Sequence, residues 1–497
     1  MMLKPLRFYA LLHCPIRTGL TGGLGVFVNL SRTFCTAKCR KESMTRDIKF
    51  GTVDQDDLFR YTSGRWLINE KHQLEQRYVK FNVKNLCSQA ASLFGPETKC
   101  VRIVKMEGSF NKALLLTMDD GNEVIAKIPC PNSGTSLLTT ASEVATLKFL
   151  RSRVSIPVPE VYAWNSDPTN PESLPSGYCH YPLPSELDPT GSFCIGPSCS
   201  RAHKASNGIS KSDVGPWTSI LDFAFSIAHR EFAFTANDKD KVQHHLTQFS
   251  DDQSVNEYRD LLQKARLFGI PTCILGISVS SDDPTKIEGV IDWQSTQAAP
   301  LLIQAQFPEF LRPPKDYSRG TEVPALPDNY DELDPDEKER AAHEQTLAAQ
   351  SKYYEMSCLV YNKSVYDAMK LDRRLWEPFT CCQLTSKGSM VPLRNSLIRI
   401  SQDWKPLGLP GSCPFEFAEE DLRRHNDQVQ QYQDYVYLWD LVKGQLRTDN
   451  SGWVPIEQWE STNKVNEYLF DMYLKALSEE VPPAVASKRW PFPPREA

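Results

Sequence analysis

The sequence lacks both a long hydrophobic run and a paired cysteine motif. No stretch of the 497 residues approaches the ~18 consecutive apolar residues that a membrane-spanning helix needs, so we expect no transmembrane segment. The 14 cysteines are scattered and form no CxxC pair, which argues against a zinc site. Thiols without a disulfide-like spacing fit a reducing, intracellular compartment.

An excess of basic charge is also absent. The chain has 56 Lys and Arg against 62 Asp and Glu, and its net charge of −6 gives no support for nucleic-acid binding. With 40% hydrophobic and 24% charged residues, the composition is that of a globular protein long enough for two or three packed units. The 35 prolines predict long ordered loops.

Acidic residues are missing from the start of the chain, where the first carboxylate is Glu42. Ser, Thr, Leu and Phe are interspersed with basic residues there, which is typical of a mitochondrial transit peptide. The run at 20–30 is too broken by glycine to serve as a secretory signal. We therefore predict that residues 1–45 are a mitochondrial transit peptide or a disordered basic tail, and that the protein is mitochondrial. The basic residues are Lys4, Arg7, Arg17, Arg32, Lys38, Arg40 and Lys41.

Three short apolar runs predict a small β-sheet after an amphipathic helix at 83–94. The runs cover 100–106, 113–118 and 124–128, and Asp119–Asn122 has the composition of a tight hairpin turn. The first two runs are separated by a turn that contains Gly108. Such a turn could lay its backbone N–H groups over phosphates, although one glycine alone is weak support.

An aromatic and basic cluster, Phe59-Arg60-Tyr61-Thr62-Ser63-Gly64-Arg65-Trp66, precedes this sheet. It could bind phosphate or an acidic partner. The alternative, which we favour, is that its aromatic side chains pack on the domain that follows.

A lysine inside the third strand is the first candidate for chemistry. Lys127 would be costly to bury without a partner, and the predicted helix at 140–150 offers Glu143. A strand Lys paired with a helix Glu is the arrangement by which kinases hold the α- and β-phosphates of ATP. The alternative is a surface salt bridge.

A single carboxylate, Asp292, follows the apolar run Gly289–Ile291. Many phosphotransferases present a magnesium ligand in this way, because the strand fixes the backbone and the carboxylate emerges at its end. The alternative is a strand that ends in a polar turn residue. The order glycine turn, strand Lys, helix Glu and strand Asp favours the functional interpretation.

Taken together, these motifs resemble a fungal branch of the aminoglycoside phosphotransferase family, which includes the altered-inheritance-of-mitochondria proteins. The resemblance covers residues 50 to 490 with interruptions, and the motifs are specific only in combination. The stretches that carry it are Phe59–Trp66, Gly108–Lys112, Ala126–Pro129, Ala141–Leu147 and Ile291–Thr296.

The resemblance implies an α+β, protein-kinase-like fold of two lobes. The expected parts are a small β-rich N-lobe at 50–164, a truncated hinge and C-lobe core at 165–310, and a C-terminal helical subdomain at 311–490. It also implies ATP and Mg²⁺ as cofactors and a hydroxyl compound as acceptor, which the sequence does not identify.

Site roles follow from the same resemblance. Lys127 matches the ATP-phosphate lysine and Glu143 its helix partner. Asp292 matches the magnesium aspartate, and Trp293 stands where protein kinases have Phe. The phosphate-covering loop contributes Gly108, Ser109 and Asn111.

Two parts of the family pattern are missing. The stretch at 165–185 is rich in Pro and Ser where the family has strands and an adenine-binding hinge. The stretch at 269–280 contains no His, Asp or Asn where the family has its catalytic loop, His-x-Asp-Leu-His-x-x-Asn. No catalytic residue can therefore be assigned. Loss of general-base catalysis alone costs on the order of 10²–10⁴ in rate.

Three interpretations of these gaps stay open. The chain is a phosphotransferase with impaired activity, a non-catalytic pseudokinase that acts as a scaffold in mitochondrial maintenance, or the product of a gene model that lost exons. The sequence does not determine the oligomeric state.

Three long helices are predicted towards the C-terminus. The first begins at Asp334 and extends to about 371, the second covers 417–446 and the third 464–477. Asp334 is the expected N-cap, followed by Pro335. The residues expected to face inward are Tyr353, Tyr354, Met356, Leu359 and Val360 in the first helix, and Val429, Tyr432, Val436, Trp439 and Val442 in the second.

Overall fold

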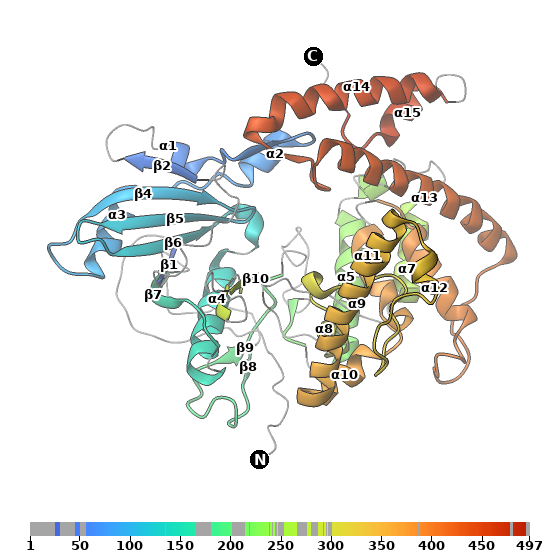
Figure 1. Cartoon of the computed structure of the whole chain (residues 1–497), viewed down its shortest axis with the longest axis horizontal. Helices are drawn as coiled ribbons and strands as arrows, with labels where there is room; N and C mark the ends of the chain where they lie inside the picture. Colours follow the sequence, from blue (N-terminus) through green and yellow to red (C-terminus); the bar gives the residue numbers. More distant parts are fainter. Residues whose placement is uncertain are drawn as a thin grey trace.

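The structure is a computed structural model, and it combines helices and strands in a mixed α+β arrangement. A β-rich half lies beside a helical half (Figure 1). The residues that it describes are 25–29, 45–49, 56–134, 136–154, 156–165, 180–200, 214–217, 219–237, 239–240, 242–243, 246, 253–265, 276–279, 287–291, 293–294, 296, 301–385, 388–477 and 481–493.

The β-rich half is built on a six-stranded antiparallel sheet of order β2-β4-β5-β6-β1-β7. The three strands predicted at 100–106, 113–118 and 124–128 are confirmed as β4, β5 and β6. The hairpin turn between β5 and β6 is also confirmed, and it is closed by a hydrogen bond from the amide of Met118 to the carbonyl of Asn122. The strands are β1 (Gly25–Asn29), β2 (Thr45–Lys49), β4 (Cys100–Glu107), β5 (Asn111–Met118), β6 (Glu123–Pro129) and β7 (Glu160–Asn165).

One strand of this sheet comes from the segment predicted as a transit peptide. β1 lies between β6 and β7 and pairs with both, with Val26 opposite Lys127 on one side and Trp164 on the other. This part of the segment 1–45 is therefore in the sheet. Its role in import stays a prediction.

Successive side chains of β6 point to opposite faces of the sheet. Val124, Ala126 and Ile128 are buried in the same core as helix α3 (Val83–Ser92), which confirms the helix predicted at 83–94. Lys127, at the intervening position, faces helix α4 (Ser136–Phe149). The period of two in a strand thus separates an apolar face from the face that carries the charged lysine.

Short two-stranded ladders connect the parts of the chain. β8 (Tyr181–Pro182) pairs with β9 (Cys194–Ile195), and β10 (Gly276–Val279) pairs with β11 (Ile287–Ile291). β3 (Gly64–Trp66) pairs with β12 (Trp453–Pro455), although about 390 positions separate them in the sequence. β3 follows α1 (Asp56–Phe59) and precedes α2 (Glu70–Glu75), and α2 lies between the sheet and the C-terminal helices (Figure 1).

The helical half has an apolar core of its own. It is formed by α5 (Ile220–Asn237), α7 (Val255–Ala265), α11 (Glu377–Thr385) and α12 (Val391–Gln402). The fully buried side chains that meet there include Phe223, Ile227, Tyr258, Leu262, Phe379, Leu393 and Leu397. In the part of the chain that the structure describes, no helix is long and apolar enough to cross a membrane.

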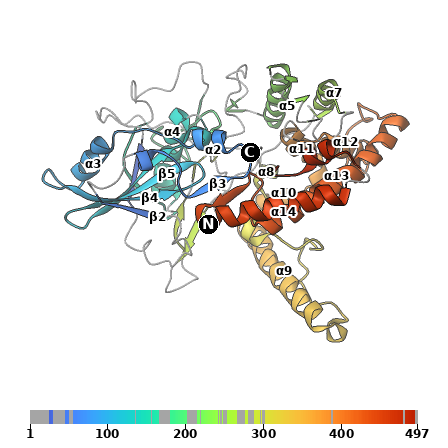
Figure 2. The ribbon, with the colours of Figure 1, turned by 90° about the horizontal axis from the view of Figure 1, so that it is seen from above.

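The first of the predicted C-terminal helices is two helices. α9 (Pro335–Tyr361) begins with Asp334 as predicted, within a complete capping box with Glu337. It ends before Asn362, whose side chain caps α10 (Lys363–Met369), so the prediction of one helix to about 371 was wrong. α9 projects from the body of the molecule (Figure 2). Its buried face carries Ser351, Glu355 and Cys358, so Tyr353 and Val360, 78% and 70% exposed, lie on another face instead of turning inward.

The other two predicted C-terminal helices are confirmed as α13 (Glu419–Leu446) and α14 (Trp459–Leu477), followed by α15 (Pro483–Arg489). Val442 is buried with Trp459 and Phe492. The remaining four residues of the predicted stripe on α13 are only half-buried. Short helix α8 (Leu301–Gln304) follows the β10–β11 ladder.

Candidate functional site

The structure brings the strand lysine and the helix glutamate together. Lys127 Nζ lies 2.5 Å from Glu143 Oε1, and their side chains are 17% and 7% exposed. Lys127 stands opposite Ala113 of β5. A buried Lys–Glu pair is far costlier to break than a surface pair, because either partner alone would be an uncompensated charge. The surface salt bridge that the sequence left open is therefore not what the structure contains.

Helix α4 carries Glu143 on an unusually polar buried surface. Thr139, Thr140, Ser142 and Thr146 are almost completely buried, and the Thr146 hydroxyl donates to the Ser142 carbonyl at 2.8 Å. Segment 180–200 packs over this helix through Leu183, Phe193, Cys194 and Cys199. Burial raises the pKa of the Cys199 thiol to about 12, so this thiol stays protonated and unreactive at neutral pH.

The predicted phosphate-covering loop is a tight turn between β4 and β5. The Gly108 amide donates to the Asn111 carbonyl at 3.2 Å, and the Asn132 side chain donates to the Ser109 carbonyl at 3.0 Å. A Cβ at Gly108 would lie 3.6 Å from the Asn111 carbonyl oxygen, an ordinary contact. The turn itself therefore does not require glycine at this position.

The same turn contacts the chain just after the predicted metal strand. Asn111 Nδ2 donates to Gln294 Oε1 at 2.5 Å. The remaining amide atoms, Asn111 Oδ1 and Gln294 Nε2, are buried and have no hydrogen-bond partner among the described residues. Trp293 is 5% exposed and its indole N–H donates to the Val290 carbonyl at 2.9 Å. The sheet, the turn and the end of β11 thus meet at one place.

Several predicted features lie outside the described residues. Asp292 is one of them, so its role as a magnesium ligand stays a prediction. Most of the region of the missing hinge is another. Of the stretch at 269–280, the structure describes only β10, in which Gly276 stands opposite Ile291. Within the described ranges, no group of three or more His, Cys, Asp or Glu could hold a metal ion.

A buried glutamate next to the turn was not among the predicted site residues. Glu107 immediately precedes Gly108, and its Oε2 accepts the Ser63 amide and hydroxyl at 2.8 and 2.7 Å. It also accepts the Thr62 amide at 2.8 Å. Glu107 Oε1 lies 2.8 Å from Lys105 Nζ and 3.9 Å from Lys112 Nζ.

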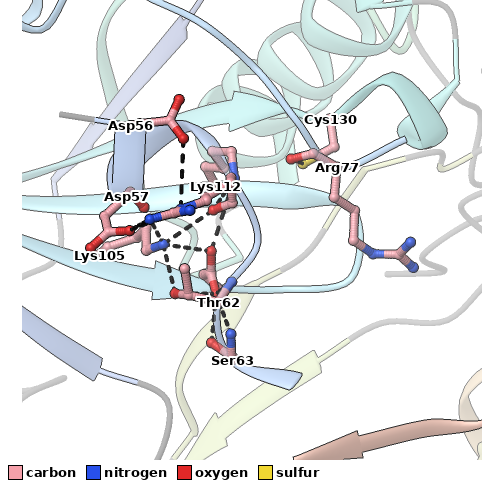
Figure 3. A network of polar contacts seen from close by, with 10 residues as sticks. Asp56, Asp57, Thr62, Ser63, Arg77, Lys105, Lys112 and Cys130 are labelled. Atoms are coloured by element: carbon pink, nitrogen blue, oxygen red, sulfur yellow. Dashed lines mark hydrogen bonds and ion pairs between the residues drawn. The ribbon is translucent and has the colours of Figure 1, made fainter. Parts of the chain in front are cut away.

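The two lysines complete this network (Figure 3). Lys105 Nζ donates to the Thr62 hydroxyl at 2.9 Å and to the Asp57 carbonyl at 2.5 Å. Lys112 Nζ donates to the Arg60 carbonyl at 3.2 Å. Burial lowers the pKa of Lys112, and Glu107 opposes that shift. Lys105, a charged residue inside the strand predicted at 100–106, was the sequence signal for this network, because buried charges must be paired. Glu107 and Lys112 were predicted to lie in the turn, but they belong to β4 and β5.

The aromatic and basic cluster at 59–66 packs inside the molecule, as the favoured interpretation stated. Tyr61 and Trp66 have ring centroids 4.9 Å apart, and Trp66 is 1% exposed. The guanidinium of Arg77 stacks 4.4 Å from the Trp66 ring. Burial lowers the pKa of Arg77. The cluster is therefore part of the fold, and its rings are not a free binding surface.

Comparison with known proteins gives relatives but no family model. The chain is similar to a subtelomeric hrmA-associated cluster protein of Aspergillus fumigatus, at 24% identity over 80% of this chain and 97% of that protein. It is also similar to altered inheritance of mitochondria protein 9, mitochondrial, of Yarrowia lipolytica, at 31% identity over 24% of this chain and 23% of that protein. The protein of the same name from Candida tropicalis matches at 26% over 30% and 29%. No family model and no solved structure matches.

These names bear on the predicted localisation. The relatives from Yarrowia lipolytica and the Candida species are named as mitochondrial. This agrees with the basic, acid-free N-terminal segment, and we assign the chain to the mitochondrion.

Proposed function

We propose that the chain is a mitochondrial protein with a kinase-like nucleotide site that binds ATP with Mg²⁺. The observation that carries this proposal is the buried ion pair of Lys127 and Glu143 next to the Gly108 turn. The names of the relatives support a role in mitochondrial inheritance.

The residues around this pair fit a polyphosphate. The Lys127 ammonium would contact the α- and β-phosphates, held in place by Glu143 from α4. Glycine at position 108 would let a ligand approach the backbone of the turn closely, because it has no side chain there. Asn111 adds a polar group on the same turn, and its Oδ1 is buried with no partner in the part of the chain that the structure describes. Asp292 would hold Mg²⁺, which when bound neutralises charge on the phosphate oxygens.

Phosphotransfer to a hydroxyl acceptor would be slow in this chain. The stretch at 269–280 offers no carboxylate to orient or deprotonate the acceptor and no Asn to hold metal. We therefore propose nucleotide binding as the retained property, with transfer impaired by at least the 10²–10⁴ that general-base catalysis contributes.

A titration of the full chain with Mg·ATP tests the binding. We expect saturable binding, and Lys127→Ala should weaken it about 10- to 100-fold, since a hydrogen bond to a charged group contributes ~1.5–3 kcal/mol. Lys148→Ala, a matched change on α4, should bind like the wild type. Equal affinity of the Lys127→Ala variant and the wild type would overturn the assignment of the site.

A non-catalytic scaffold is the second candidate. The lack of His, Asp and Asn at 269–280 favours it directly. Nucleotide binding without ATP turnover under single-turnover conditions would support the scaffold. Transfer of the γ-phosphate to any hydroxyl acceptor would exclude it.

A further inference from the structure

One short segment lies between the phosphate-covering turn and the C-terminal helices. We call residues 56–67, which comprise α1 and β3, the strap. In Figure 1 the blue chain around α1 and α2 extends from the sheet to the ends of α13 and α14. The strap forms hydrogen bonds both with the sheet and with the C-terminal helical part of the chain.

On the sheet side, the strap is bound to both residues that flank the turn. Glu107, which precedes Gly108, accepts from Thr62 and Ser63 of the strap. Lys112, which follows the turn, donates to the Arg60 carbonyl. All the charged side chains of this contact are at most 2% exposed, so solvent does not weaken it.

On the other side, the strap is a strand of the C-terminal subdomain. Gly64 and Trp66 stand opposite Pro455 and Trp453 in the β3–β12 ladder. The ladder continues at both ends. The amide of Leu67 donates to the Gly452 carbonyl at 2.9 Å, and the amide of Ile456 donates to the Ser63 carbonyl at 3.1 Å.

Packing reinforces this second contact. Leu67 is buried in one core with Val442, Val454 and Phe492. The Arg65 guanidinium lies 4.2 Å from the ring of Trp459 at the start of α14.

Ser63 therefore contacts both sides at once. Its amide and hydroxyl bind Glu107, and its carbonyl accepts from Ile456. A displacement of β12 would move Ser63. Ser63 would in turn move the carboxylate of Glu107, the residue directly before Gly108.

We propose that the strap positions the turn 108–111 over the nucleotide phosphates, with Ser63 and Glu107 as positioning residues, and that it couples nucleotide affinity to the packing of the C-terminal helices. This proposal rests on the nucleotide site proposed above. It adds that the C-terminal subdomain determines how firmly the turn is held. The subdomain acts through the β3–β12 ladder, which contains none of the predicted phosphate-binding residues.

Two variants break the strap at different points. A Cβ at Gly64 would lie 2.4 Å from Trp453 Nε1 and 2.6 Å from the Val454 carbonyl oxygen, so Gly64→Ala separates β3 from β12. Ser63→Ala removes only the hydroxyl that donates to Glu107, and Ser63→Thr keeps one. Gly444→Ala on α13 is the matched control, because a Cβ there meets nothing within 4 Å.

The experiment measures hydrogen exchange of the peptide covering 107–112 in the nucleotide-free full chain, and then the Mg·ATP affinity. We expect Gly64→Ala and Ser63→Ala to speed exchange in this peptide about tenfold, which corresponds to one lost charge-assisted hydrogen bond. Their Mg·ATP affinity should fall about 5- to 20-fold. Ser63→Thr and Gly444→Ala should resemble the wild type in both measurements.

The outcomes separate the two proposals. Unchanged exchange and unchanged affinity in Ser63→Ala, a change small enough for the fold to survive, would overturn the role of the strap even if Gly64→Ala does not fold. Faster exchange in the variants, together with no Mg·ATP binding by the wild type, would overturn the nucleotide site and uphold the coupling of strap and turn. Faster exchange with wild-type affinity would overturn the positioning role.

Discussion

Asn111 at the start of β5 and Gln294 just after β11 are joined by a side-chain hydrogen bond of 2.5 Å across 183 positions of sequence. This contact places the phosphate-covering turn against the chain that immediately follows Asp292. It is the closest structural link between two stretches that the sequence could only assign to the same site by resemblance.

The Asn111–Gln294 contact should contribute measurably to stability. Gln294→Ala leaves the Asn111 amide buried without an acceptor, which costs about 1–3 kcal/mol. A double-mutant cycle with Asn111→Ala, followed by urea unfolding, should give a coupling energy of ~0.5–1.5 kcal/mol. Additive effects of the two substitutions would show that the residues do not interact in solution.

Glu107 should make the protein sensitive to acid. Burial alone would raise the pKa of Glu107, but Lys105 and the hydrogen bonds from Ser63 and Thr62 outweigh it and hold the pKa below its ordinary value. A carboxylate whose pKa is lower in the folded than in the unfolded chain stabilises the fold at any pH above the unfolded pKa of ~4.3. This contribution is lost as the pH falls from there through the folded pKa.

The substitution Glu107→Gln isolates that contribution. It should lower the free energy of unfolding at pH 7 by about 3–5 kcal/mol, because it leaves two buried lysines without their counter-charge. The loss should shrink as the pH falls below ~4.3, because the unfolded wild type then gains a proton that the folded Glu107 resists. Chemical unfolding at pH 7 and pH 3.5 measures both values. An equal loss at the two pH values would contradict an ionised Glu107.

His425 should add a second pH dependence in a higher window. It is 3% exposed on α13, and burial, with the nearby Arg394 guanidinium, lowers its pKa to about 4. Its Nε2 lies 3.4 Å from Asn395 Oδ1, and Arg394 is itself paired with Glu257. The unfolded chain binds a proton near pH 6.5 and the folded chain only near pH 4. The fold therefore loses stability as the pH falls from 6.5 to 4.

The expected size of this loss is about 3 kcal/mol, from 1.36 kcal/mol for each pKa unit. It should disappear in His425→Gln, which cannot gain a proton. Thermal unfolding between pH 7 and pH 4.5 measures the slope. His343, on the solvent-accessible part of α9, is the control position, and His343→Gln should leave the slope as it is in the wild type.

Glu355 should hold the proline-rich loop at 313–330 against α9. Its carboxylate accepts the Tyr317 hydroxyl at 2.6 Å, the Gly320 amide at 2.8 Å and the Lys352 ammonium at 3.0 Å. Glu355→Ala removes all three acceptor contacts and should expose this loop to protease, with a loss of about 3–5 kcal/mol.

Limited proteolysis with fragment mapping tests this prediction. Cleavage within 313–330 should be at least tenfold faster in Glu355→Ala than in the wild type. Glu344→Ala changes an exposed carboxylate of the same helix and should be cut at the wild-type rate. If both variants are cut alike, the loop is held by contacts other than the carboxylate.

Elements that depend on neighbouring residues could be predicted from short stretches of the sequence. Three apolar runs separated by turn residues predicted β4, β5 and β6, and Asp334 with Pro335 predicted the start of α9. A strand lysine followed by a helix glutamate was enough to name Lys127 and Glu143 as partners, because a buried charge needs its opposite.

Only the tertiary structure decided which distant segments meet. Nothing local to Ser63 predicts that it binds both Glu107 and Ile456, and nothing near Val360 predicts that another face of α9 is the buried one. Contacts between residues far apart in the sequence depend on how the two halves of the molecule pack together. A helical period shows which residues share a face, but it cannot show whether another element covers that face.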